Sequence, residues 1–118
     1  HSFPTRRSSD LFSAYAAHID DEKFMTALCC VRNLGRIAAC RPARRNEIAR
    51  LLLDVDRRCH FPEKQKELLK CDVIEALEGI YESMPDKTPA DEFIRAAGKS
   101  VSPKTKARAR RFEAEHRL

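Results

Sequence analysis

Tryptophan is absent from this 118-residue chain, glycine occurs only three times, and no long apolar run is present. The longest clear apolar stretch covers residues 27–31, far short of the roughly 18 residues that a membrane-spanning helix needs. The alternation of apolar and polar residues that is typical of strands is also scarce. These absences argue against a membrane span and against a β-sheet fold.

Sequence motifs that carry catalysis or hold cofactors are missing as well. No P-loop, dinucleotide-binding, zinc-protease or EF-hand spacing occurs. The five cysteines are odd in number and include no C-x-x-C pair, so we predict buried, reduced thiols without a zinc site. His18, His60 and His116 lie far apart, and the adjacent side chains of Cys59 and His60 are expected to point apart in a loop. We therefore predict no catalytic residue, no cofactor, no metal and no small-molecule substrate.

The composition that remains is that of one charged, soluble domain. Charged residues make up 35% of the chain, apolar residues 42%, and the formal net charge is +5. This apolar content suffices for a thin, layered core in a chain of single-domain length. No charged-then-apolar leader with a small-residue cleavage site begins the sequence. We accordingly expect a cytoplasmic protein.

Two stretches of the chain resemble each other at a fixed spacing. Four residues recur 43 positions later: Val31, Leu34, Ile37 and Pro42 return as Ile74, Leu77, Ile80 and Pro85. Each stretch has the apolar spacing of a helix face and a proline just past its end. A period in the forties is typical of helix-pair solenoids, in which each unit buries its apolar face against the next. The pattern predicts an all-α, right-handed solenoid of antiparallel helix pairs.

Helical periodicity and Pro-containing turns divide the chain into a series of helices. The expected helices cover residues 12–19, 22–39, 43–57, 63–83, 90–99 and 104–116. Ser102-Pro103 supplies a helix start signal, and we expect the last helix to cap the solenoid with a polar outer face. At the other end we expect an exposed apolar face made by Phe12, Tyr15, Ile19 and Phe24.

The first eleven residues are unlike the rest. Residues 1–11, HSFPTRRSSDL, match codon by codon the translation of a common short-read sequencing adapter. We therefore treat residues 1–11 as a non-native or disordered segment and residues 12–118 as the domain. The domain is then expected to be the C-terminal fragment of a longer protein.

Three short motifs resemble those of HEAT-repeat, armadillo-like proteins, and more narrowly the short bacterial HEAT-like type. They are DDEKFMTA at residues 20–27, LGRIA at residues 34–38 and SPKTK at residues 102–106. Thr26 stands where the common repeat often has Arg. The resemblance implies a non-catalytic scaffold that mediates protein–protein interaction.

The distribution of charge suggests an alternative function. Two segments are mainly basic: residues 32–58 hold eight basic and three acidic residues, and residues 95–111 hold seven basic residues and no acidic one. The segment between them, residues 63–92, is mainly acidic, with nine acidic and four basic residues. Basic helices can bind phosphates, although Phe112 is the only aromatic residue near the last cluster, so base stacking is not expected. The alternative is sequence-nonspecific binding of a nucleic-acid backbone, as in HEAT-like DNA repair proteins, or of another acidic surface. The candidate residues for an anionic partner are Arg32, Arg36, Arg44, Arg45, Lys99, Lys104, Lys106, Arg108, Arg110 and Arg111.

Overall fold

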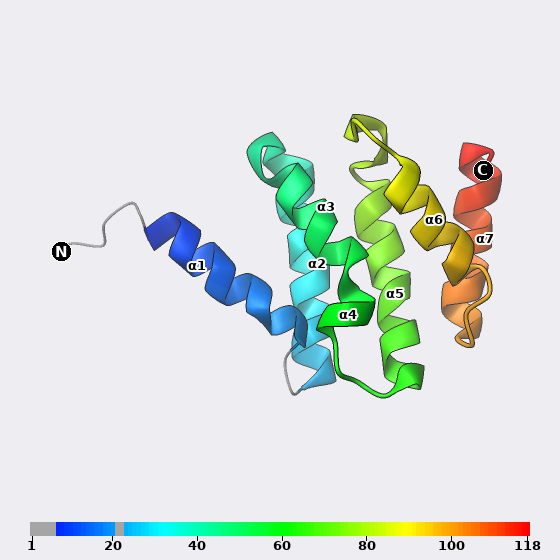
Figure 1. The fold of residues 1–118 in the computed structure, drawn as a ribbon, viewed down its shortest axis with the longest axis horizontal. Coiled ribbons are helices and arrows are strands. Elements are labelled where there is room, and N and C mark those ends of the chain that lie inside the picture. The colour runs from blue at the N-terminus through cyan, green and yellow to red at the C-terminus, as the bar shows by residue number, and fades with distance from the viewer. Residues whose placement is uncertain (1–6, 21–22) are drawn as a thin grey trace.

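The computed structural model describes residues 7–20 and 23–118, and within these ranges the secondary structure is entirely helical (Figure 1). The all-α prediction is confirmed. In chain order, the helices and 3-10 turns are α1 (Arg7–Ala16), η1 (Ala17–Asp20), α2 (Phe24–Cys40), η2 (Pro42–Arg44), α3 (Arg45–Leu53), α4 (Val55–Arg58), α5 (Glu63–Glu78), η3 (Tyr81–Ser83), α6 (Thr88–Ala97) and α7 (Pro103–His116).

The helices form two layers. Helices α2, α5 and α7 lie side by side and run in the same direction, while α3 and α6 return across them (Figure 1). Helix α5 is central, because it packs against α2 on one side and α7 on the other. The chain therefore contains two antiparallel helix pairs, α2 with α3 and α5 with α6, followed by α7.

The core lies between these layers and contains the repeated apolar positions. Four of the repeated residues are fully buried, and a fifth, Ile80, is 2% exposed. The fully buried residues are Val31, Leu34, Ile74 and Leu77. Ile37 is only partly buried and packs at the margin of the core. Because helix residues three and four apart share one face, the repeated spacing gives α2 and α5 the apolar stripe that each buries.

The helix expected at residues 43–57 is divided in two. Helix α3 ends at Leu53, and Asp54 leaves helical geometry with φ −102° and ψ 14° before α4 begins. The Asp54 carboxylate accepts a hydrogen bond from Arg57 Nε at 3.1 Å. The side chain of Asp54 also forms an ion pair with Arg58, so this carboxylate holds two arginines of α4 beside the break.

The helix expected at residues 63–83 ends earlier than predicted. Helix α5 stops at Glu78, and Ile80 has φ −124° before the 3-10 turn η3. Glycine at position 79 has low helix propensity, so the helix ends there although the apolar spacing continues. Helix α6 begins two residues before the expected start, at Thr88, with Pro89 in its first turn.

The N-terminal helix differs from the expectation in extent and in exposure. Helix α1 begins at Arg7, inside the segment that we separated from the domain; residues 1–6, and the side chains of residues 7–11, lie outside the described structure. The predicted exposed face is wrong: Ile19 is 1% exposed, and Phe12, Tyr15 and Phe24 are partly buried. Phe24 packs edge-on against Phe61 at 5.5 Å, because the loop after α4 covers this end of α2.

A membrane-spanning helix is not found in the described structure, where every helix is too short or too polar to cross a bilayer.

Candidate functional site

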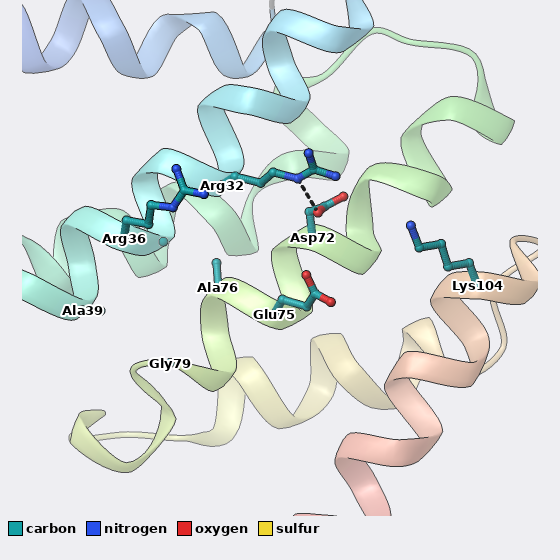
Figure 2. Close-up of a pocket in the computed structure, with 9 residues that line it drawn as sticks. Arg32, Arg36, Ala39, Asp72, Glu75, Ala76, Gly79 and Lys104 are labelled. Carbon is teal, nitrogen blue, oxygen red and sulfur yellow. Dashed lines mark hydrogen bonds and ion pairs between the residues drawn. The ribbon is translucent and has the colours of Figure 1, made fainter.

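An open groove runs between α2 and α5 on the side away from α3 and α6, and its far end reaches α7 (Figure 2). Its volume is about 550 Å³. The residues that line it are Arg32, Gly35, Arg36, Ala39, Asp72, Glu75, Ala76, Gly79 and Lys104.

Small residues form the floor of this groove. Gly35 and Ala39 of α2 face Ala76 and Gly79 at the end of α5. A Cβ atom at Gly35 would lie 2.8 Å from the Cβ atom of Ala76, so the two helices approach one another as closely as they do because residue 35 has no side chain. The groove is hollow for the same reason: no long side chain fills the space above the helix contact.

An arginine and a buried carboxylate connect the two walls. Arg32 Nε donates a hydrogen bond to Asp72 Oδ1 at 2.9 Å, and this bond raises the pKa of Arg32. The Asp72 side chain is only 8% exposed, whereas that of Arg32 is 48% exposed. The pair neutralises the buried carboxylate, and the terminal guanidinium nitrogens of Arg32 make no further hydrogen bond in the described part of the chain.

Two further cations stand at the rims. Arg36 donates from Nη1 to the side-chain oxygen of Asn33 at 3.0 Å, and Asn33 donates in turn to the hydroxyl of Tyr15 at 2.9 Å. Lys104, at the start of α7, lies at the opposite side of the groove (Figure 2). Neither Arg36 nor Lys104 forms an ion pair with any described residue. A ligand in the groove would therefore meet positive charge on both rims.

Exposed apolar side chains lie beyond one end of the groove. Met25 is 63% exposed and Leu68 is 36% exposed. Met25 is two turns before Arg32 on α2, and Leu68 is one turn before Asp72 on α5, so helical spacing places each on the stripe that continues into the groove. The α2–α5 surface thus combines exposed apolar side chains near one end with charges along its middle.

Two residues predicted to bind an anion are engaged within the chain. Arg45 donates to the carbonyl oxygens of Ala38 at 2.7 Å and Ala39 at 3.0 Å, where it caps the end of α2. Arg108 is buried, forms an ion pair with Glu78, and has Nε 3.8 Å from a Glu75 carboxylate oxygen. Both guanidinium groups hold helices together.

The other predicted anion-binding residues do not form one patch. Arg32, Arg36 and Lys104 line the groove, and Lys99 and Arg110 line a separate hollow between α6 and α7. Arg44 stacks over the Phe12 ring at 4.4 Å. The remaining two are exposed on α7: Lys106 and Arg111.

Sequence reasoning missed the acidic and apolar parts of the groove. The charge pattern marks Asp72 and Glu75 only as members of an acidic segment, and it does not distinguish Met25 or Leu68 from core residues. Two glycines beside repeated apolar positions, Gly35 after Leu34 and Gly79 before Ile80, were a usable signal, because a glycine in a helix often marks a close contact. The partner helix in that contact could not be identified from spacing alone.

The neighbours Cys59 and His60 lie in different environments, because Cys59 is buried and the side chain of His60 is 80% exposed. Cys59 Sγ donates to the carbonyl oxygen of Ile19 at 3.0 Å, and burial raises the pKa of this thiol to about 11. His60 Nδ1 lies 2.7 Å from the carboxylate of Asp20. A reactive cysteine needs a lowered pKa, so this arrangement is suited to holding η1 against the loop after α4 and not to nucleophilic attack.

Potential metal ligands do not converge in the described structure. Within residues 7–20 and 23–118, no group of three or more His, Cys, Asp or Glu side chains is placed to hold a metal ion.

Comparison with known proteins found no matching family model, no matching curated protein and no matching solved structure. The resemblance to HEAT-repeat proteins thus stays a prediction from the sequence motifs.

Proposed function

We propose that this protein is a non-catalytic, HEAT-like helical scaffold whose α2–α5 groove binds a protein partner. The observation that carries the proposal is the groove itself, which has a small-residue floor, cations without an ion-pair partner among the described residues on both rims, and exposed Met25 and Leu68 beyond one end. Helix pairs that repeat at 43 residues and present parallel helices on one side support a right-handed solenoid. Such repeats commonly provide extended binding surfaces.

The groove favours a particular partner chemistry. Protein interfaces combine an apolar centre with a polar rim, and a helix can lay anchor residues at i, i+3, i+4 and i+7 into a groove. A fitting segment would place apolar side chains on Met25 and Leu68. It would also place acidic side chains towards Arg36 and Lys104, whose charges are not neutralised within the described chain.

The test is to capture a partner with the intact protein, identify it, and measure its dissociation constant with purified components. Met25→Glu and Arg36→Glu should each weaken binding by about tenfold or more, which is about 1.4 kcal/mol, because each substitution places a negative charge on the proposed contact surface. Arg50→Glu is the matched control, because Arg50 is an exposed arginine of α3 outside the groove. The proposal fails if all three variants bind the partner equally.

A salt series separates this proposal from binding through charge alone. Partner retention that persists at high salt agrees with an interface that buries Met25 and Leu68, because apolar contacts are not screened. Partner retention that disappears with added salt would show that the contact depends on charge alone, and it would contradict an interface that buries Met25 and Leu68.

A further inference from the structure

A second hollow lies between the end of α6 and the middle of α7, and it shares no residue with the α2–α5 groove. Its volume is about 530 Å³. The residues lining this basic hollow are Arg95, Ala96, Gly98, Lys99, Arg110 and Glu113.

The cations of the basic hollow are exposed and not neutralised. Arg95 and Lys99 form no ion pair or hydrogen bond with another side chain in the described structure. Arg110 donates only a long hydrogen bond, 3.4 Å, from Nε to the carbonyl oxygen of Gly98, which leaves its terminal nitrogens free to donate. Glu113 is the single carboxylate among the lining residues, so three positive charges face one negative charge.

Helix electrostatics account for only part of this cluster. Arg95 and Lys99 lie at the carboxyl end of α6, where positive charge is stabilised by the helix dipole. Arg110 comes from the middle of a different helix, so the dipole of α6 does not explain its presence. Lys106 is one turn before Arg110 on α7, and this spacing extends the row of cations beyond the hollow.

We propose that the basic hollow binds the phosphodiester backbone of a nucleic acid without regard to base sequence. Arginine side chains favour phosphate, because the planar guanidinium can donate two parallel hydrogen bonds. No side chain lining the hollow is aromatic or a large aliphatic, so it offers neither a base-stacking platform nor the apolar centre of a protein interface. Interfaces with nucleic acid are typically polar and positively charged, as this one is.

The test uses the intact chain and fluorescently labelled DNA, single-stranded and duplex, in several unrelated sequences. Affinities should be similar across sequences and fall steeply between about 50 and 200 mM salt. Lys99→Ala and Arg110→Ala should each weaken binding several-fold. Each should also reduce the slope of log K against log salt on duplex DNA by about 0.9 for every phosphate that the variant no longer neutralises. Both residues are exposed, so neither substitution disturbs the core.

Arg50→Ala is the control for loss of charge, because Arg50 is an exposed arginine of α3 that does not line the basic hollow. For Arg50→Ala, the slope of log K against log salt should equal that of the unsubstituted protein. An equal loss of slope in Arg50→Ala and Arg110→Ala would overturn the proposal, because binding would then depend on net charge and not on this hollow. Competition by polyglutamate as strong as competition by unlabelled DNA would also overturn it, since the ligand would then be a carboxylate-rich protein segment.

Discussion

At the scale of single residues, burial divides the cysteines into two chemical classes. Cys30, Cys59 and Cys71 are buried as free thiols, whereas Cys29 and Cys40 are exposed, so the prediction of burial is wrong for these two. Burial raises the pKa of Cys59 to about 11, and burial also raises the pKa of Cys71. Since the thiolate is the reactive form, buried thiols of this kind are inert at neutral pH.

We predict that a disulfide exchange reagent at pH 8 will modify Cys29 and Cys40 rapidly and the three buried thiols only after unfolding. Quantitative thiol titration of the folded protein, with and without denaturant, checks this. A Cys59 that reacts as fast as Cys40 would show that the loop after α4 opens readily.

The same pKa gives a dependence of stability on alkaline pH. The pKa of Cys59 in the folded protein exceeds the ordinary value of 9.0. The protonated thiol therefore contributes fully to the free energy of unfolding below pH 9, and this contribution is lost as the pH rises towards 11. Urea unfolding across this range should therefore show a smaller decline for Cys59→Ala than for the unsubstituted protein.

At the scale of helices, two glycines line the groove between α2 and α5 but have different surroundings. A Cβ atom at Gly35 would meet Ala76 Cβ at 2.8 Å and Ala76 Cα at 3.2 Å. A Cβ atom at Gly79 would have only an ordinary contact, 3.5 Å from the Ala76 carbonyl oxygen. Gly79 also has φ −63°, a conformation that alanine adopts freely.

We predict opposite effects for the two glycine-to-alanine substitutions. Gly35→Ala should lower the free energy of unfolding by about 1–3 kcal/mol, because the added methyl group forces the packed helices apart. Gly79→Ala should be neutral or stabilise by about 0.4–1 kcal/mol, because it restricts the unfolded chain without a clash. Urea unfolding of both variants provides the measurement, and similar losses in both would contradict the close approach at Gly35.

At the scale of the whole molecule, polar contacts join α7 to α5 and complete the layer of parallel helices. Thr105 Oγ1 donates to the carbonyl oxygen of Glu67 at 2.6 Å, and the buried Arg108 pairs with Glu78. Burial alone would raise the pKa of Glu78, but the hydrogen bond and charge of Arg108, helped by His116, lower it below its ordinary value of 4.5. The ionised form of Glu78 therefore stabilises the assembled layer.

We predict that stability will fall in acid partly through Glu78. A carboxyl group whose pKa is lower in the folded than in the unfolded protein stabilises the fold at any pH above the unfolded pKa. This stabilisation disappears as the pH falls below about 4.5 and through the folded pKa. Urea unfolding from pH 7 downwards should show a smaller acid-induced loss for Glu78→Gln than for the unsubstituted protein. Glu115→Gln is the control, because Glu115 lies in an exposed pair with Arg111 at 4.0 Å, and its stability should depend on pH as that of the unsubstituted protein does. The same pH dependence in all three proteins would contradict the role of Glu78.

The sequence by itself determined the approximate positions of the main helices and the buried faces of α2 and α5. Spacing of three and four residues marked Leu34 and Leu77 as core, because that spacing is a property of the helix alone. Ser102-Pro103 marked the start of α7, and the Ser102 hydroxyl does accept from the backbone N–H of Thr105 at 3.3 Å. Such local signals act within a few residues, so they can be read without knowledge of the fold.

Only the tertiary structure decided which charged residues are available for binding. Arg36 and Arg45 look alike in sequence, yet Arg36 stands on a groove rim and Arg45 caps α2 from the next helix. Arg108 lies in the most basic segment but is buried against Glu78, 30 residues earlier. The environment of a charge depends on which helices pack beside it, and residues distant in sequence determine that packing.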